Sequence, residues 1–188
     1  MPRTSPRPGS LPAEATSFVG RRHELAEARK KLAAARLVSL VGPGGVGKTR
    51  LAIRIAASLE RGFSGGAAMA ELAEVRDPAL VAGVVMAALG LRDQAGGEPL
   101  AVLCSYLADK DLLLVLDNCE HLLEAAARIV GEVIRAAPGV RVIATSREPL
   151  AVDGEHVLPV PPLELPAPDA AEPLAQVRQN ERAMSAAS

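Results

Sequence analysis

Apolar residues follow two patterns along this chain. Nearly continuous apolar runs occur at 37–41, 112–116 and 140–145, with weaker ones at 67–72 and 156–160. Such runs are typical of strands buried on both faces of a parallel sheet. Between them, apolar residues recur with a helical period at 22–36, 49–59, 78–89, 99–108 and 121–137. This alternation predicts an α/β fold with three layers, α/β/α, around a mainly parallel five-stranded sheet.

The two ends of the chain show neither pattern. Residues 1–15 and 164–188 are rich in proline, which predicts a disordered lead-in at 1–15 and a flexible linker or truncated C-terminal tail at 164–188. The chain has 188 residues, enough for one α/β domain with a sizeable core but not for two large domains. We therefore expect a single domain over residues 16–163.

A glycine-rich turn joins the first predicted strand to the helix at 49–59. Residues 42–49 fit G-x-x-x-x-G-K-[ST], the phosphate-binding P-loop or Walker A motif. Glycines let backbone N–H groups approach phosphates closely, the helix N-terminus adds unpaired N–H groups, the lysine provides a cation, and the hydroxyl can bind Mg²⁺. The residues expected to bind nucleotide here are Gly42, Pro43, Gly44, Gly45, Val46, Gly47, Lys48, Thr49 and Arg50.

The run at 112–116 ends in Asp117. An acid at the carboxyl end of a buried strand is the Walker B pattern, whose carboxylate holds Mg²⁺, so Thr49 and Asp117 are the predicted metal residues. Many P-loop ATPases place a second acid next to this position, but Asn118 cannot accept a proton. Glu120 could orient a water molecule instead, or could favour the N-terminus of the following helix through the helix dipole.

Arg147 follows the run at 140–145. A guanidinium at the carboxyl end of this strand could contact a γ-phosphate and act as a sensor of ATP. The alternative is an exposed loop arginine that pairs with Glu148. Asp117, Glu120 and Arg147 are thus the candidate catalytic residues, and hydrolysis is less firmly predicted than binding.

Composition narrows the classes of function. The net charge is −1 and aromatic residues make up 2% of the chain, so neither a basic field nor a stacking surface for nucleic acid is expected. No apolar run is long enough to span a membrane, and the N-terminus lacks the apolar core of a signal peptide. Cys104 and Cys119 form no disulfide framework. We expect a cytoplasmic protein with no membrane partner and no direct nucleic-acid site.

Four segments in this order resemble the NTPase domain of STAND regulators: Phe18 to Arg21, Gly42 to Thr49, Leu112 to Glu120 and Ala144 to Glu148. The chain is most similar to the NB-ARC-like domain of bacterial ATP-binding transcriptional regulators of the SARP and large LuxR types. The resemblance covers residues 16–163. It implies an ATP/ADP-operated switch in which Val19, Gly20 and Arg21 contact the adenine and ribose side of the nucleotide.

The resemblance has further implications. It places the P-loop strand centrally in the sheet, beside the Walker B and sensor strands. In that family the chain continues into a helical lid and a winged-helix domain, so we expect residues 164–188 to precede such domains or to replace them. We expect any homo-oligomer to require a full-length form, and this chain to be monomeric with slow or no hydrolysis. The alternatives are an autonomous P-loop ATPase, a small-molecule phosphotransferase, or a scaffold that binds nucleotide without hydrolysing it.

Overall fold

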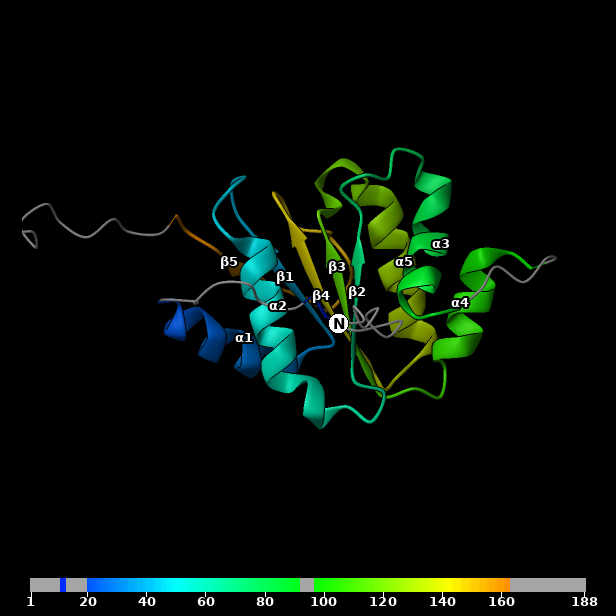
Figure 1. The fold of residues 1–188 in the computed structure, drawn as a ribbon, viewed down its shortest axis with the longest axis horizontal. Helices are drawn as coiled ribbons and strands as arrows, with labels where there is room; N and C mark the ends of the chain where they lie inside the picture. The colour runs from blue at the N-terminus through cyan, green and yellow to red at the C-terminus, as the bar shows by residue number, and fades with distance from the viewer. Residues whose placement is uncertain (1–10, 13–19, 92–96, 163–188) are drawn as a thin grey trace, which may run out of the picture.

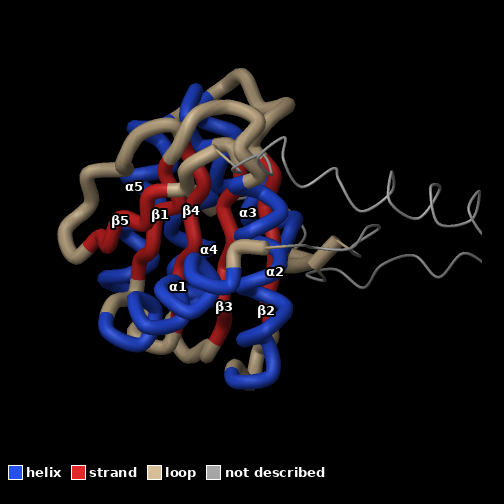
Figure 2. Tube along the Cα trace, turned by 90° about the vertical axis from the view of Figure 1, so that its left-hand side faces the viewer, coloured by secondary structure: helices blue, strands red, loops and turns tan. Residues whose placement is uncertain are grey.

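The computed structural model describes residues 11–12, 20–91 and 97–162. Its centre is a sheet of five parallel strands in the order β2-β3-β4-β1-β5, which lie side by side in Figure 2. The predicted α/β fold is confirmed. The strands are β1 (Leu37–Val41), β2 (Ala67–Glu71), β3 (Leu112–Asp117), β4 (Val140–Ser146) and β5 (Glu155–Pro159).

Helices cover both faces of this sheet (Figure 1). One face carries α1 (Arg22–Ala34) and α2 (Lys48–Leu59), and the other carries α3 (Val81–Ala88), α4 (Pro99–Leu107) and α5 (Leu123–Ala136). Three short 3₁₀ turns complete the described elements: η1 (Glu60–Gly62), η2 (Pro78–Leu80) and η3 (Cys119–His121). The three predicted layers are therefore present.

Strand alternation divides the core into two parts. In β3, Leu112, Leu114 and Leu116 pack with α3–α5, whereas Leu113 and Val115 pack with α1 and α2. All six residues of β3 are buried, as expected for a parallel strand covered on both faces. Residues at odd positions of this strand thus face the layer that contains α2.

Two helices start later than their apolar period predicts. Residues 78–80 form the 3₁₀ turn η2, where the Asp77 carboxylate accepts a hydrogen bond from the Ala79 N–H at 2.9 Å. Residues 119–121 form η3, which follows Asn118 in the left-handed region at φ 62°. Leu122 then adopts φ −132° and ψ 33°, which is not helical, so the chain enters α5 only at Leu123.

The P-loop strand was predicted to lie at the centre of the sheet, beside the Walker B and sensor strands, and this prediction is wrong in two respects. The P-loop strand β1 lies between β4 and β5, and it is β4 that occupies the centre and pairs with both β1 and β3. β1 is thus beside the sensor strand but not beside the Walker B strand. Both edges of β4 form hydrogen bonds, so this strand lies between β1, which leads into the P-loop, and β3, which ends in Asp117. No helix in the described ranges is long and apolar enough to cross a membrane.

Candidate functional site

The P-loop connects β1 to α2 at the edge of the sheet where all five strands end. Gly45 and Gly47 adopt φ angles of +78° and +87°, which side chains other than glycine rarely adopt. A Cβ at Gly42 would collide with the backbone carbonyl oxygen of Val160, just after β5. The loop therefore needs glycine for conformation at two positions and for close packing at a third.

Lys48 is the first residue of α2, and its side chain folds back over the loop. Its Nζ donates hydrogen bonds to the carbonyl oxygens of Gly42 at 2.8 Å and Pro43 at 2.9 Å, and the residue is 7% exposed. A buried cation is costly unless an anion or several acceptors compensate it. Two neutral carbonyls do so only partly, and this arrangement fits a phosphate group at the loop.

Asp117 receives hydrogen bonds from two hydroxyls. Thr49 Oγ1 donates to its carboxylate at 2.8 Å from Oδ1 and 3.0 Å from Oδ2, and Thr145 Oγ1 donates to Oδ1 at 2.6 Å. Asp117 is 3% exposed. The hydroxyl of the P-loop and the acid of β3 are thus brought together, although they are 68 residues apart in sequence.

This pair of side chains fits Mg²⁺. Both offer oxygen atoms, and a buried carboxylate that receives hydrogen bonds from neutral hydroxyls still favours a nearby positive charge. Mg²⁺ typically takes one or two protein carboxylates together with waters and substrate phosphates. The described residues contain no group of three or more His, Cys, Asp or Glu side chains that could hold a metal.

Glu120 and Arg147 form an ion pair, with Arg147 Nε 3.5 Å from Glu120 Oε1. The Arg147 guanidinium also lies over the P-loop, since a Cβ at Gly44 would be 3.4 Å from its NH2 group. Arg147 thus pairs with Glu120 rather than with Glu148, the partner considered from sequence. The Oε2 atom of Glu120 is buried without a hydrogen-bond partner.

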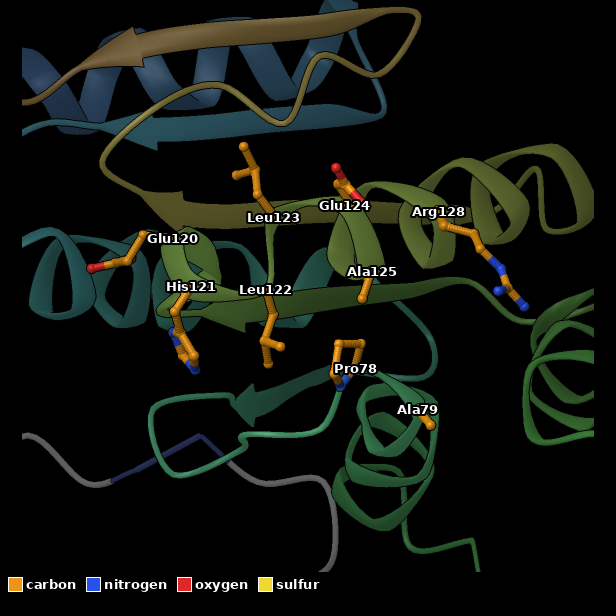
Figure 3. Close-up of a pocket in the computed structure, with 9 residues that line it drawn as sticks. All are labelled: Pro78, Ala79, Glu120, His121, Leu122, Leu123, Glu124, Ala125 and Arg128. Carbon is orange, nitrogen blue, oxygen red and sulfur yellow. The ribbon is translucent and has the colours of Figure 1, made fainter.

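A cavity of about 480 Å³ adjoins this ion pair. Its walls come from the ends of β2, β3 and β4, and it is lined by Ala73, Arg76, Asn118, Glu120, His121, Arg147 and Glu148. A second hollow of about 590 Å³ lies between η2 and the start of α5 (Figure 3). Glu120 and His121 border both, and no P-loop residue lines either one. Arg147, which lines only the first cavity, also lies over Gly44, so the first cavity is the one that adjoins a side chain next to the P-loop.

The segment that precedes α1 is fixed by Arg21. Its guanidinium donates to the carbonyl oxygens of Val46 in the P-loop at 2.7 Å and Pro161 after β5 at 2.8 Å, and it pairs with Glu24 at 3.1 Å. The side chain therefore holds protein groups together. Gly20 is exposed at φ +87°, and Val19 lies outside the described residues. Arg50 is exposed in the first turn of α2.

Sequence reasoning missed two parts of the site. Thr145 binds Asp117 directly, although the sequence singled out only Arg147 at the end of this strand. The clue was its position, because a polar residue at the carboxyl end of a strand lies where ligands bind in α/β sheets. The backbone at Val160 and Pro161 also supports the P-loop, and no side-chain pattern indicates such a contact.

Both cysteines are free thiols. Burial raises the pKa of the Cys119 thiol to about 12, and the carboxylates of Asp117 and Glu120 add to the shift. Burial also raises the pKa of Cys104, helped by Glu132 and Glu98. Because the thiolate is the nucleophile, a raised pKa lowers the reactivity of both thiols at neutral pH.

No protein-family model matches the chain. A protein of Mycobacterium tuberculosis without an assigned function is 43% identical over 150 residues, which are 80% of this chain and 38% of that protein. A candidate HTH-type transcriptional regulator of the same organism is 43% identical over 137 residues, covering 73% of this chain and 15% of the relative. The regulatory protein AfsR of Streptomyces griseus is 31% identical over 154 residues, covering 75% of this chain and 15% of AfsR. The chain thus spans less than half the length of these relatives.

Two solved structures share the fold. The STAND protein with a tetratricopeptide repeat sensor from Pyrococcus horikoshii has a TM-score of 0.58 at 18% identity, covering 90% of this chain and 27% of that one. Cdc6p from Pyrobaculum aerophilum has a TM-score of 0.58 at 17% identity, covering 82% of this chain and 48% of Cdc6p. The STAND-type resemblance of the motifs is confirmed: this chain has the fold of STAND and Cdc6-type P-loop ATPases and is homologous to a segment of bacterial regulatory proteins that include AfsR.

Proposed function

We propose that residues 16–163 form an ATP- and ADP-binding switch domain of a bacterial signalling or transcriptional regulator. The observation that carries the proposal is the hydrogen bond from Thr49 Oγ1 to Asp117 at 2.8 Å. It joins the end of the P-loop to the acid of β3, so the two candidate metal residues converge on one point. The names of the relatives, an HTH-type regulator and AfsR, support the regulatory part.

Each group at the site has a role in this proposal. The loop N–H groups and the N-terminus of α2 bind the phosphates, and Lys48 moves from the Gly42 and Pro43 carbonyls to the β- and γ-phosphates. Thr49 and Asp117 would hold Mg²⁺, which would neutralise phosphate charge when bound. Bound nucleotide then biases a two-state regulator by the difference in its affinity for the two states.

The test is calorimetric titration of ATP and ADP with Mg²⁺ into the wild type and Lys48→Ala. Removing a charge-assisted hydrogen bond costs about 1.5–3 kcal/mol, or about ten- to a hundredfold in affinity. Lys30→Ala on the exposed surface of α1 removes the same charge far from the loop and should bind like the wild type. Equal affinity in the wild type and Lys48→Ala would contradict the P-loop assignment.

A small-molecule phosphotransferase is the second candidate. Arg76, Glu120 and Arg147 line the cavity of about 480 Å³. Arg147 also lies over Gly44 of the P-loop, and acids with arginines are what an acceptor site needs. A switch turns over slowly, whereas dedicated enzymes reach about 1 per second or faster. Steady ATP consumption at such a rate on addition of a small hydroxyl or amine acceptor would favour this second function.

A further inference from the structure

We infer that Thr145 is a positioning residue for the divalent cation of this site, acting through Asp117. The inference rests on the proposed function and concerns a residue that neither the P-loop nor the Walker B pattern contains. Thr145 is 0% exposed and lies near the end of β4. Its hydroxyl is the only side-chain polar group it has, so the hydrogen bonds of that hydroxyl define what the residue can do.

The register of the sheet brings Thr145 to Asp117. Leu116 of β3 pairs with Ala144 of β4, so the next residues along each strand, Asp117 and Thr145, are cross-strand neighbours. Val115 and Ile143, two residues earlier, both pack in the part of the core next to α2. Because side chains alternate along a strand, Asp117 and Thr145 face the same layer, where α2 begins with Lys48 and Thr49.

The Thr145 hydroxyl uses its hydrogen and one lone pair at the site. It donates to Asp117 Oδ1 at 2.6 Å and accepts from the Asn118 N–H at 2.9 Å. Hydroxyl-to-carboxylate bonds of this length belong to the strong, charge-assisted class. One side chain therefore fixes both the carboxylate of Asp117 and the peptide group that follows it.

This dual contact matters because the backbone after Asp117 is unusual. Asn118 adopts φ 62° and ψ 51°, a region that Asn tolerates better than most residues but that still costs energy. The bond from the Asn118 N–H to Thr145 offsets that cost. Without it, the end of β3 would have one anchor fewer and the carboxylate could rotate away from Thr49.

The same carboxylate oxygen, Oδ1, accepts from both Thr145 and Thr49. Thr145 thus holds Asp117 beside the P-loop hydroxyl before any cation arrives. A cation site whose ligands are already oriented loses less entropy on binding. Loss of the Thr145 hydroxyl should therefore weaken the part of nucleotide binding that depends on Mg²⁺, and should leave the contacts of the phosphates with the loop and Lys48 in place.

The experiment measures ATP affinity in Mg²⁺ and in EDTA for the wild type, Thr145→Val and Thr145→Ser. Val has nearly the shape of Thr without the hydroxyl, and Ser keeps the hydroxyl. We expect Thr145→Val to reduce the gain in affinity that Mg²⁺ provides by about tenfold, the effect of one or two hydrogen bonds. In EDTA its affinity should stay within about twofold of the wild type, and Ser should restore most of the gain.

A double-mutant cycle with Asp117→Asn separates positioning from stability. If Thr145 acts through Asp117, Thr145→Val should have no further effect on the Mg²⁺-dependent gain in the Asp117→Asn background. Thermal unfolding of each variant without nucleotide reports packing, and Thr145→Ala serves if the Val variant does not fold. Equal losses in Mg²⁺ and EDTA, no loss in either, or additive effects in the cycle would overturn the inference. If the wild type bound ATP in neither buffer, the proposed function would be overturned, and this inference with it.

Discussion

The ion pair of Glu120 with Arg147 sets up a competition that nucleotide can reveal. A sensor arginine must reach the γ-phosphate, and Arg147 already lies over Gly44 of the P-loop. In the structure it is 3.5 Å from Glu120 Oε1. We therefore predict that ATP draws Arg147 away from Glu120, whereas ADP, which lacks the γ-phosphate, does not.

The expected changes in ATP affinity follow from how exposed the Glu120 and Arg147 side chains are. The Arg147 side chain is 67% exposed and that of Glu120 is 20% exposed, so the pair contributes only about 0.2–1 kcal/mol. Glu120→Gln should release Arg147 and tighten ATP binding by about 1.4- to 5-fold. Arg147→Ala removes a charge-assisted contact worth about 1.5 kcal/mol or more, which solvent screening reduces, so we expect ATP binding about five- to tenfold weaker.

The assay is competitive titration of ATP and ADP against a fluorescent nucleotide in both variants. ADP affinity should change by less than about twofold in either. The matched control is Glu148→Gln, which removes an exposed carboxylate next to Arg147 that does not pair with it. If Arg147→Ala weakened ATP and ADP alike, the sensor role would be refuted. If Glu120→Gln weakened ATP binding, the two residues would cooperate rather than compete.

Two further predictions concern stability and reactivity. Arg21→Ala should lower the free energy of unfolding in urea by about 2–4 kcal/mol, because it leaves two carbonyl oxygens without the buried guanidinium that now donates to them. Arg21→Lys should recover part of the lost stability. An unchanged urea midpoint for Arg21→Ala would contradict the prediction. A thiol reagent at pH 8 should label Cys104 before Cys119, because Cys119 is buried and its pKa is raised to about 12, whereas Cys104 is half-buried. The raised pKa keeps the Cys119 thiol protonated in the fold, so its contribution to stability is complete below about pH 8.5, the pKa of an unfolded thiol, and is lost as pH rises toward 12. Rapid labelling of Cys119 in the folded protein would refute the assignment.

The strands and layers were predictable because burial leaves a direct trace in sequence. β1 and β3 occupy the residues expected from their continuous apolar runs, since a strand covered on both faces tolerates few polar side chains. The order of the strands was not predictable in the same way. β1, β3 and β4 are all buried on both faces, and the apolar pattern carries no information about which of them pair.

The candidate site likewise has a part that the sequence predicts and a part that it does not. The P-loop motif could be recognised residue by residue, because phosphate binding needs particular residue types at fixed spacing, and phosphate binding by these residues stays a prediction. The partner of Arg147 could not, since a carboxylate one residue away in sequence and one 27 residues away are equally reasonable until the turn after β3 is known. The 3₁₀ turn at 119–121 brings Glu120 to the end of β4, and nothing in the local sequence predicted that turn in place of an α-helix.

Asn118 links the geometry of the site to its proposed chemistry. The position needs a left-handed conformation at φ 62° so that the chain can leave β3 and form η3, and Asn tolerates this better than Glu. A Glu next to Asp117 would therefore strain the turn that carries Glu120 toward Arg147. Under the proposed function, the same turn that disfavours Glu as a neighbouring general base provides an acid paired with the sensor. Separation of that pair by a γ-phosphate would free the Glu120 carboxylate at the same moment. Binding of ATP and the availability of a base would then be one event, which favours a switch that is slow to hydrolyse over an enzyme with a permanently active base.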